Sequence, residues 1–493
     1  MTGARRRRRF GFESLATRAN ENATAQGGTV STITTPAQAA RQELSGFAGR
    51  LIGPEDADYE EARRVYNAMA DKRPALIARA AGADDVAAAI GFARDHGLLL
   101  AIRGGGHNGA GLGTCDDGVV VDLGALDEVE VDPGARSVRV GGGATWGQVD
   151  NATYEHGLAT PSGIISTTGV GGLTLGGGLG HLTRRFGLAI DNLLAAELVL
   201  ASGERVRASA AENHPDLFWA IRGGGGNFGA VTSFTFRLHE VGDVFGGPTF
   251  WAVEDAAEVL AAYREFLPGA PRELNGFFAF HTVPPAPPFP EQIHLRKVCG
   301  VVWCYAGGEA EASEAIAPLL DSVPEPLMHG VQTMPHPALQ SAFDGLYPPG
   351  DQWYWRADFV NEIPDEAVAA HARFGAEMPT MKSTMHMYPI DGAANDPAPD
   401  DTAWSYRDAT WASVFAGVDP DPANADQIRR WSIDYFDALH PYAAGGAYVN
   451  FLMDEGQERV QSSFRDNYAR LAMIKSKYDR TNLFRVNQNI RPA

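Results

Sequence analysis

The chain has 493 residues, of which 44% are hydrophobic and 21% charged, a composition typical of a soluble globular protein with two or three domains. Its 41 Lys and Arg residues against 61 Asp and Glu residues give a formal net charge of -20, which argues against nucleic acid as a partner because phosphates would be repelled. Three cysteines match no disulfide framework or metal-ligand spacing and predict a cytoplasmic protein without a metal. No apolar run approaches the roughly 20 residues of a transmembrane helix, so we expect no membrane partner.

The N-terminal 40 residues contain five consecutive arginines, Arg5 to Arg9. The polar stretch after them lacks the apolar segment that an export signal requires. We therefore expect residues 1–40 to be a disordered extension, with an interaction tail as the alternative.

Further along, residues 55–108 have the pattern of a helix, a strand, a second helix and a second strand. Asp84 or Asp85 is expected to cap the second helix and Gly97 to end it. Strands are then predicted in "VVVDL", "VEVD" and "SVRVGGG", a helix in "TWGQVDNATYEHGL", and a hairpin that turns at Ser202 and Gly203. The segment "DLFWAIRGGGGNFGAVTSFTFRLHEVG" predicts a helix, a glycine loop and an alternating strand.

The composition changes near residue 241, where glycine clusters end and prolines gather. Long strands alternate with helices from there to about residue 440. The last 50 or so residues predict a strand, a charged amphipathic helix and an Asn-rich tail. We place a domain boundary at residue 241.

Three glycine clusters occupy residues 104–113, 169–180 and 223–229. Consecutive glycines let several backbone N–H groups point to one centre, which can bind a pyrophosphate without basic side chains. One cluster alone is as readily a tight turn, but three of them, each next to a predicted strand, favour a ligand cradle. A Rossmann site needs a helix after its glycines, and "TCDDGVVVDL" after Gly113 has no helical periodicity.

The segments "RGGGHN", "PSGIISTTGVGGLTLGGGLGHLTRRFGLAIDNL" and "RGGGGNFGAVTSF" together resemble the FAD domain of the vanillyl-alcohol oxidase and para-cresol methylhydroxylase (PCMH) superfamily. The ending "YVNF" followed by "NYARLAMIKSKYDRTNLFRVNQNI" resembles the C-terminal module of the berberine bridge enzyme group, which includes hydroxynicotine oxidase and several sugar oxidases. The resemblance covers roughly residues 60–493, and its motifs are specific in combination.

The resemblance implies an α+β fold with a two-lobed FAD-binding domain of PCMH type over residues 41–240. An α/β substrate domain, with an antiparallel sheet flanked by helices, is expected over residues 241–440. Residues 441–493 would form a berberine-bridge-like segment that returns to the FAD domain.

In this family the histidine after the glycine triplet is joined covalently, through a ring nitrogen, to the 8α-methyl group of FAD. The match implies that His107 is this residue, although a lone histidine at a strand end is more often structural. The residues that match the family's FAD contacts are Arg103, Gly104, Gly105, Gly106, His107, Asn108, Ser162, Gly163, Thr167, Thr168, Gly169, Gly171, Gly172, Gly177, Gly180, His181, Leu182, Asp191, Asn192, Val231, Asn450, Asn487 and Asn489.

Many relatives carry a second covalent link through a cysteine in a G-x-C-x-T-x-G motif. Here residues 163–169 have Ile165 at the cysteine position, and Cys115 lies in a different loop. The resemblance therefore implies FAD with a single covalent link.

The base that takes the substrate proton is not evident, because relatives often have a tyrosine after the Y-x-N motif and this chain has Phe451 there. Another group takes the proton, or none is needed, as for an amine that arrives deprotonated. Strand alternation places Tyr354 opposite Trp353 and Trp355, and places His386 and Tyr388 opposite Met385 and Met387. An ordinary sheet face is the slightly favoured interpretation for each of these residues taken alone. The candidates are Tyr448, Tyr354 and His386, with Glu362 as a further possibility.

The resemblance implies an FAD-dependent oxidase acting on a small-molecule alcohol, amine or phenolic compound, as in secondary metabolism, with O2 as electron acceptor. In the berberine bridge group a valine-sized residue before "G-x-G-G" accompanies oxidases and a leucine accompanies dehydrogenases, and this chain has Thr168 there. Two alternatives stay open, a flavin dehydrogenase with a non-oxygen acceptor and a flavin-binding protein without catalysis. The sequence carries no motif for the substrate or the oligomeric state.

Overall fold

The computed structural model describes residues 35–211 and 213–493, of which Pro36–Ala493 form one compact unit. The expected disordered extension lies outside the described residues up to position 34. Helix α1 (Pro36–Glu43) begins inside the expected range and buries Ala37 and Ala40, so the prediction of disorder is wrong for residues 36–40. The methyl groups of Ala37 and Ala40 pack into the core around β2 and β4. The polar residues of this stretch gave no indication of that burial. No helix within the described residues is both long and apolar enough to cross a bilayer.

A four-stranded sheet comes first, with the order β1-β2-β4-β3 and parallel pairing among its last three strands. Its elements are β1 (Arg50–Ile52), α2 (Tyr59–Ala62), β2 (Leu76–Arg79), α3 (Ala83–Asp95), β3 (Leu100–Arg103) and β4 (Val119–Asp122). Gly82, not an aspartate, is the N-cap of α3, whereas the Asp85 carboxylate accepts backbone N–H groups of Ala48, Gly49 and Ala81 at 2.8 Å each. Gly97 follows the helix with a φ of 64°, as expected for a C-terminal glycine.

The second sheet has five antiparallel strands in the order β5-β6-β10-β8-β9. The elements of this region are β5 (Val129–Asp132), β6 (Ser137–Gly141), α4 (Trp146–Tyr154), β7 (Leu158–Ala159), α5 (Val170–Leu175), α6 (Thr183–Phe186), β8 (Leu193–Val199), β9 (Arg205–Ser209), α7 (Pro215–Ile221), β10 (Ala230–Arg237) and β11 (His239–Glu240). Strands β7 and β11 pair with each other in a separate two-stranded sheet. The predicted hairpin between β8 and β9 is confirmed: Gly203 has a φ of 89° and donates to the Leu200 carbonyl at 2.9 Å.

The third and largest sheet has eight strands, all paired antiparallel, in the order β15-β12-β14-β13-β18-β19-β17, with β16 paired to β12. Its elements are β12 (Asp243–Ala252), α8 (Ala256–Phe266), β13 (Leu274–Thr282), β14 (Lys297–Tyr305), α9 (Glu309–Leu320), β15 (Met328–His329), β16 (Gln332–Pro335), α10 (His336–Gln340), β17 (Gln352–Val360), α11 (Asp365–Ala376), β18 (Thr384–Pro389), β19 (Trp411–Asp419) and α12 (Ala425–Leu439). The α+β fold with an antiparallel sheet flanked by helices is therefore confirmed.

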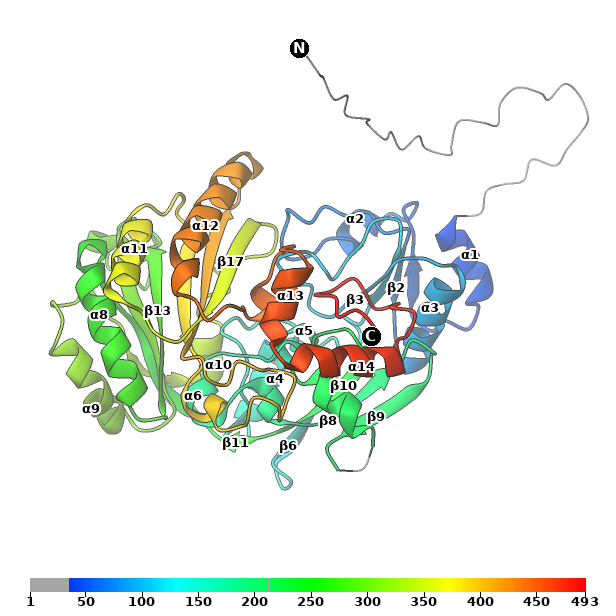
Figure 1. Cartoon of the computed structure of the whole chain (residues 1–493), viewed down its shortest axis with the longest axis horizontal. Coiled ribbons are helices and arrows are strands. Elements are labelled where there is room, and N and C mark those ends of the chain that lie inside the picture. The colour runs from blue at the N-terminus through cyan, green and yellow to red at the C-terminus, as the bar shows by residue number, and fades with distance from the viewer. Residues whose placement is uncertain (1–34, 212) are drawn as a thin grey trace, which may run out of the picture. The chain divides into compact units, whose positions relative to one another are not determined.

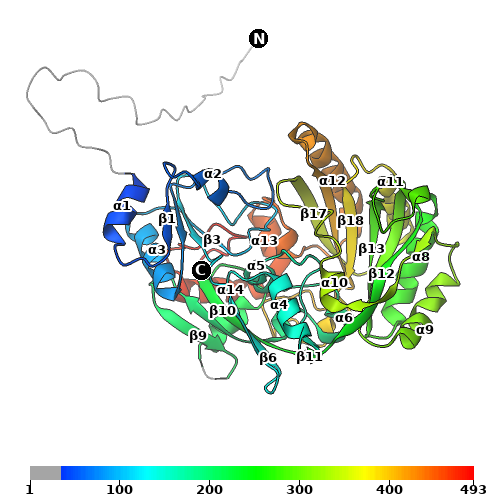
Figure 2. The same cartoon turned by 180° about the vertical axis from the view of Figure 1, so that it is seen from behind.

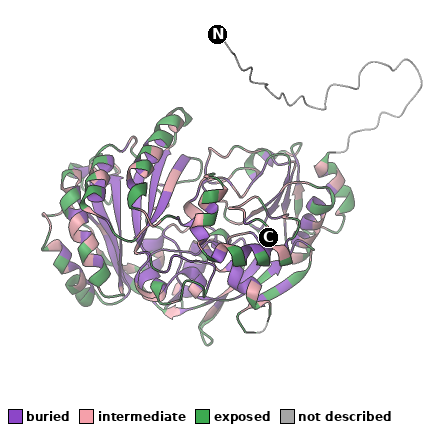
Figure 3. Ribbon diagram, viewed as in Figure 1, coloured by how far each residue is buried: buried purple, intermediate pink, exposed green. Residues whose placement is uncertain are grey.

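Each face of this large sheet belongs to a different core. Helices α8, α11 and α12 cover one face, and Phe278, Met385 and Phe415 pack under them (Figures 1 and 2). Residues one position along, such as Phe277 and Val414, point to the opposite face and join a core shared with the five-stranded sheet. Figure 3 shows the strands buried on both sides. The alternation of side chains along each strand thus decides which residues pack under the helices and which pack against the five-stranded sheet.

The C-terminal segment contains α13 (Gln457–Phe464) and α14 (Asn467–Tyr478), which pack into the core of the five-stranded sheet. The strand predicted before them is wrong, because residues Val449–Phe451 form a 3-10 turn closed by the Phe451 N–H on the Tyr448 carbonyl at 2.8 Å. The apolar pattern arises because Tyr448, Val449 and Leu452 are buried although they lie in and beside a turn and not in a strand.

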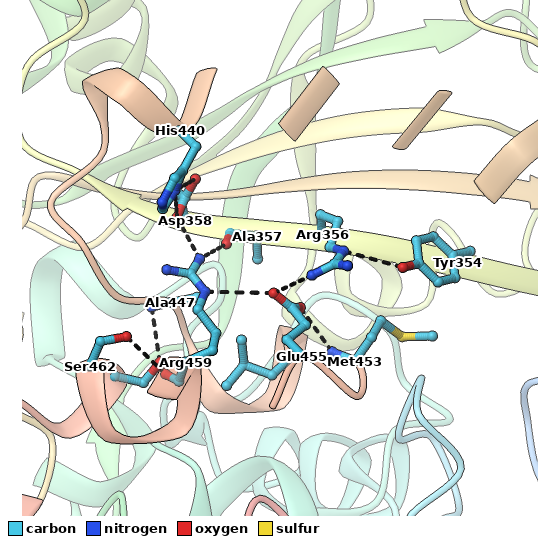
Figure 4. A network of polar contacts seen from close by, with 12 residues as sticks. Tyr354, Arg356, Ala357, Asp358, His440, Ala447, Met453, Glu455, Arg459 and Ser462 are labelled. Carbon is cyan, nitrogen blue, oxygen red and sulfur yellow. Dashed lines mark hydrogen bonds and ion pairs between the residues drawn. The ribbon is translucent and has the colours of Figure 1, made fainter. Parts of the chain in front are cut away.

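A network of ion pairs fastens this segment to β17 (Figure 4). Glu455 pairs with Arg356 of β17 at 2.7 Å, and Arg459 pairs with Asp358 of the same strand at 2.5 Å. His440 also approaches Asp358 at 3.1 Å, and its hydrogen bond to this carboxylate raises the pKa of the imidazole. These contacts are all on the side of β17 that carries Tyr354 and Arg356.

Buried Lys475 joins the tail to the third glycine loop. Its side chain is fully buried, pairs with Asp479 at 2.6 Å, and donates to the carbonyls of Asn227 and Phe484 at 2.6 and 2.8 Å.

We expect Lys475→Met to lower the free energy of unfolding by about 3–5 kcal/mol, because a buried carboxylate loses its partner. Lys477→Met, which breaks an exposed pair with Asp216, should cost less than about 1 kcal/mol. Thermal and denaturant unfolding of both variants measure the difference, and equal midpoints would contradict it.

Candidate active site

A cavity of about 330 Å³ lies where the three glycine loops, the C-terminal segment and strands β17 to β19 meet. Its lining contains glycines 104–106, 169, 171, 172 and 224–226 on one side and aromatic residues of the large sheet on the other. Chain segments separated by several hundred residues therefore build one site.

The first two glycine loops touch through their backbones. A Cβ atom on Gly105 would lie 2.5 Å from the Gly169 nitrogen, and one on Gly169 would lie 2.4 Å from the Gly105 nitrogen. Both positions thus require glycine. Gly172 and Gly226 line the cavity differently, because a Cβ atom on either would enter open space. Bare backbone that faces an open cradle fits a bound pyrophosphate, so the residues present suit FAD.

The charge of Arg103, the arginine of this lining, is already compensated. Its guanidinium donates to the Asp122 carboxylate at 3.0 Å and to the Ala62 carbonyl at 2.7 Å. The groups available in the cradle to bind phosphate are therefore the backbone N–H groups of the glycine loops.

His107 belongs to the first glycine loop and contacts the second. Its ring stacks on Tyr66 with 3.9 Å between ring centres, its Nε2 atom lies 3.1 Å from the Thr167 hydroxyl, and its Nδ1 atom lies 3.4 Å from the Thr168 hydroxyl. Burial lowers the pKa of His107 to about 4, against the opposing effect of a hydrogen bond to the Thr167 backbone. The imidazole is consequently neutral at physiological pH, the form in which a ring nitrogen has a free lone pair.

Most residues matched to the family's FAD contacts line the cavity. They are Arg103, Gly104, Gly105, Gly106, His107, Asn108, Gly163, Thr168, Gly169, Gly171, Gly172, Val231, Asn450 and Asn487. Those outside the lining are Ser162, Thr167, Gly177, Gly180, His181, Leu182, Asp191, Asn192 and Asn489.

Of the residues outside the lining, Thr167 contacts a residue within it, and others are held by contacts elsewhere. Thr167 holds His107, as described above, and the Asp191 carboxylate forms a two-pronged ion pair with Arg407 at 2.7 and 2.8 Å. Ser162 accepts a hydrogen bond from Gln340 of α10 at 3.0 Å. His181 is buried without a hydrogen-bond partner among the described residues, and burial lowers its pKa to about 3.

Tyr354, one of the three proton-transfer candidates, does not line the cavity. Trp353 and Trp355 do line it, so the predicted alternation along β17 is confirmed. The same alternation directs Tyr354, which lies between them, away from the cavity. The Tyr354 hydroxyl accepts a hydrogen bond from Arg356 at 3.2 Å, and the Arg429 guanidinium lies over its ring. Glu362 is exposed beyond the end of β17 and also lies outside the lining.

His386 lines the cavity together with Tyr388, which the sequence placed on the same strand face but which we did not select. The Nδ1 atom of His386 and the Tyr388 hydroxyl are 2.6 Å apart. Burial lowers the pKa of His386 well below its usual range and raises that of Tyr388, so the pair is uncharged at neutral pH. The Nε2 atom of His386 has no partner among the described residues.

Tyr448 also lines the cavity, but its hydroxyl accepts the Gly178 N–H at 3.0 Å and the Asn450 amide at 2.7 Å. Burial raises its pKa to about 12 despite these bonds. Tyr66 and Tyr347, which also line the cavity, lie in segments without regular structure and gave no sequence signal.

A glycine cradle that fits a pyrophosphate, a neutral histidine at its edge and an aromatic wall suit a flavin-dependent oxidoreductase. Comparison with known families agrees: residues 74–209 match the FAD binding domain, and residues 447–491 match the family described as berberine and berberine like. The chain belongs to the berberine bridge enzyme-like family of FAD-linked oxidoreductases.

Two curated relatives are similar over nearly their whole length. An FAD-linked oxidoreductase of Dictyostelium discoideum is 30% identical over 437 residues, covering 88% of this chain and 92% of the relative. The uncharacterized FAD-linked oxidoreductase YgaK of Bacillus subtilis is 30% identical over 458 residues, covering 91% and 98%. Among solved structures, 6-hydroxy-D-nicotine oxidase from Arthrobacter nicotinovorans superposes with a TM-score of 0.79 and 26% identity, covering 91% of this chain and 98% of that one.

The contact between the glycine loops generates a prediction. We expect Gly169→Ala to reduce the flavin content of the purified protein about tenfold, because overpacking of about 1–3 kcal/mol separates the loops that form the cradle. Gly46→Ala is the control, since a Cβ atom there meets nothing within 4 Å. The ratio of flavin to protein absorbance measures the effect, and an unchanged ratio in Gly169→Ala would show that the loop contact is dispensable.

Proposed function

We propose that the protein is an FAD-dependent oxidase that holds its flavin by one covalent bond to His107 and oxidises a small-molecule alcohol, amine or phenolic compound, with O2 as acceptor. The observation that carries this proposal is the position of His107. A neutral imidazole, with a threonine hydroxyl at each ring nitrogen, lies at the rim of the glycine cradle and in the same cavity as His386 and Tyr388.

The contacts of His107 support Nδ1 as the atom that bonds to the flavin. A ring proton on Nε2 is directed to Thr167, whose hydroxyl is nearer than that of Thr168 and whose backbone also contributes a hydrogen bond. Nδ1 then keeps its lone pair, and stacking on Tyr66 holds the ring plane. Ile165 lines the cavity, whereas the Cys115 thiol is buried outside it against the Val119 carbonyl. This arrangement supports a single link.

With an alcohol as substrate, bound FAD would supply the hydride acceptor, and the overall reaction would convert the alcohol and O2 into a carbonyl compound and H2O2. The hydroxyl proton of the substrate is assigned to Nε2 of His386, with Nδ1–H of the same ring donating to the Tyr388 oxygen. Tyr448 is assigned to positioning, because its oxygen already accepts two N–H groups. Phe451 and Trp355 line the cavity, with 6.3 Å between their ring centres.

Covalent attachment gives the first test. His107→Ala should lose all flavin that survives acid precipitation, and Thr167→Val should lower the covalent fraction severalfold, because the ring then lacks the hydroxyl that orients it. Thr167→Ser keeps the hydroxyl and should retain the wild-type fraction. Peptide mass spectrometry should find FAD mass on the His107 peptide, and a flavin on a cysteine peptide would contradict the single link.

Reoxidation gives the second test. Thr168 lines the cavity beside His107, and its side chain has the size of valine. We expect Thr168→Leu to slow the return of flavin absorbance about tenfold or more when anaerobically reduced protein meets aerated buffer, because the larger side chain fills the space next to the flavin. Thr168→Val is the matched control and should reoxidise at the wild-type rate. A wild-type flavin that stays reduced for minutes in air would instead support a dehydrogenase.

A further inference from the structure

The start of the second glycine loop is held by a carboxylate from a distant part of the chain. Asp344, in the turn after α10, accepts the Ser166 N–H through Oδ1 at 3.1 Å and the Ser166 hydroxyl through Oδ2 at 2.5 Å. The two residues are 178 positions apart. A carboxylate that binds two donors of one residue restrains both its place and its orientation, so this contact fixes Ser166 in two directions.

Helix α4 holds the carbonyl groups of the same loop. The Gly147 N–H donates to the Ser166 carbonyl at 2.8 Å, and the Trp146 N–H donates to the Thr168 carbonyl at 2.9 Å. The Thr168 N–H closes the turn on the Ile165 carbonyl at 3.2 Å. The N–H, hydroxyl and carbonyl groups of Ser166 are thus all engaged, and the first two of them depend on one carboxylate.

The two hydroxyl groups that contact His107 follow Ser166 directly in the chain. They belong to Thr167 and Thr168 and lie 3.1 and 3.4 Å from the ring nitrogens. Neither Ser166 nor Asp344 lines the cavity. An effect of this carboxylate on the imidazole is therefore exerted through the turn, by the placement of the two threonines.

Asp344 also lies near the ring that stacks on His107. Burial is the main cause that raises the pKa of Tyr66, and the negative charge of Asp344 adds to it. The Tyr66 hydroxyl donates to the carbonyl of Tyr347, three residues after Asp344, at 2.6 Å. One short segment thus contacts both the loop beside the imidazole and the ring stacked upon it.

The segment that carries Asp344 is itself anchored. The neighbouring ring, Phe343, packs against His386 of β18 with 6.1 Å between ring centres. Gln340, at the end of α10, donates to the Ser162 hydroxyl at 3.0 Å, so the segment contacts the same loop at a second point. A carboxylate that is fixed by the packing of its neighbours can orient its partner, whereas one on a mobile loop cannot.

We propose that Asp344 is a positioning residue for His107. By fixing Ser166 it holds the two threonine hydroxyls against the imidazole, and so orients the ring nitrogen at which the flavin bond forms. This inference deepens the proposed function and rests on it for the covalent bond. That bond replaces one C–H bond of the 8α-methyl group and one ring N–H bond, and O2 takes up the two hydrogens as H2O2.

Variants of the two partners separate the contact from the charge. Asp344→Ala removes both acceptors. Asp344→Asn removes the charge but keeps one acceptor for the Ser166 N–H and one donor for its hydroxyl oxygen. Ser166→Ala removes the hydroxyl and keeps the N–H. Asp396→Ala is the control, because it removes an exposed carboxylate between β18 and β19 that pairs with Arg272 at 2.8 Å.

The first measurement is the covalent fraction, which is the flavin that survives acid precipitation divided by the total flavin of the full-length holoprotein. We expect it to fall about fivefold in Asp344→Ala and about twofold in Ser166→Ala, because one and two hydrogen bonds of the turn are lost in the second and first variant. The double variant should match Asp344→Ala, since both changes break one contact. Asp344→Asn and Asp396→Ala should keep the wild-type fraction.

Three results would overturn the positioning role. They are a wild-type covalent fraction in Asp344→Ala, an equal fall in Asp344→Asn, and a loss of total flavin and thermal stability in Asp344→Ala that leaves the covalent fraction of the remaining flavin unchanged. The last result would reveal a residue that supports folding alone.

Hydrogen exchange tests the contact without reference to the covalent bond. Deuterium uptake by peptides that cover residues 162–169 should rise in Asp344→Ala and not in Asp344→Asn, with the third glycine loop unchanged. Faster uptake with a wild-type covalent fraction would also overturn the proposal. If the wild-type protein releases all its FAD in acid, the covalent bond of the proposed function is contradicted. The dissociation constant of FAD then decides: a value about fivefold higher in Asp344→Ala supports the positioning role, and an unchanged value overturns it.

Discussion

The close contact between the backbones of Gly105 and Gly169 is the constraint on which the site depends. An isolated β-bridge to Thr145 holds Gly169, and the absence of two Cβ atoms lets it touch Gly105. That contact sets the separation between His107, which follows one glycine, and Thr168, which precedes the other. The same two loops then present their remaining glycines to the open cradle. One steric condition therefore fixes both the place of the cofactor and the surroundings of the histidine.

The large sheet supplies the other half of the site through its two-residue period. On β13, β18 and β19, alternate side chains enter the helix-covered core and the core shared with the glycine-loop region. On β17, Trp353 and Trp355 face the cavity, while Arg356 and Asp358 hold the C-terminal segment through Glu455 and Arg459. The lining of the cavity and the anchoring of the C-terminal segment thus use opposite faces of one strand. A substitution on the cavity face leaves the ion pairs that fasten the strand untouched.

The glycine loops, the hairpin at Gly203 and the alternation along β17 could all be predicted, because each follows from local backbone geometry or from a fixed period. Alternation does not say which of two faces meets a cavity, which is why Tyr354 was a candidate although it lies outside the lining. Tyr66 and Tyr347 could not be found, since they reach the site from irregular segments through tertiary contacts alone. The strand expected near residue 448 failed for a related reason: burial produces an apolar pattern whether or not a neighbouring strand exists to pair with.

The tail of the chain has a consequence for the biogenesis of the holoprotein. Asn487 and Gln488 line the same cavity as Arg103, and Lys475 ties the Asn227 loop to the Phe484 backbone. A nascent chain still attached to the ribosome cannot complete this cavity until residues near 488 have emerged. The lining of the cavity is for that reason completed late, by residues more than 250 positions after the third glycine loop.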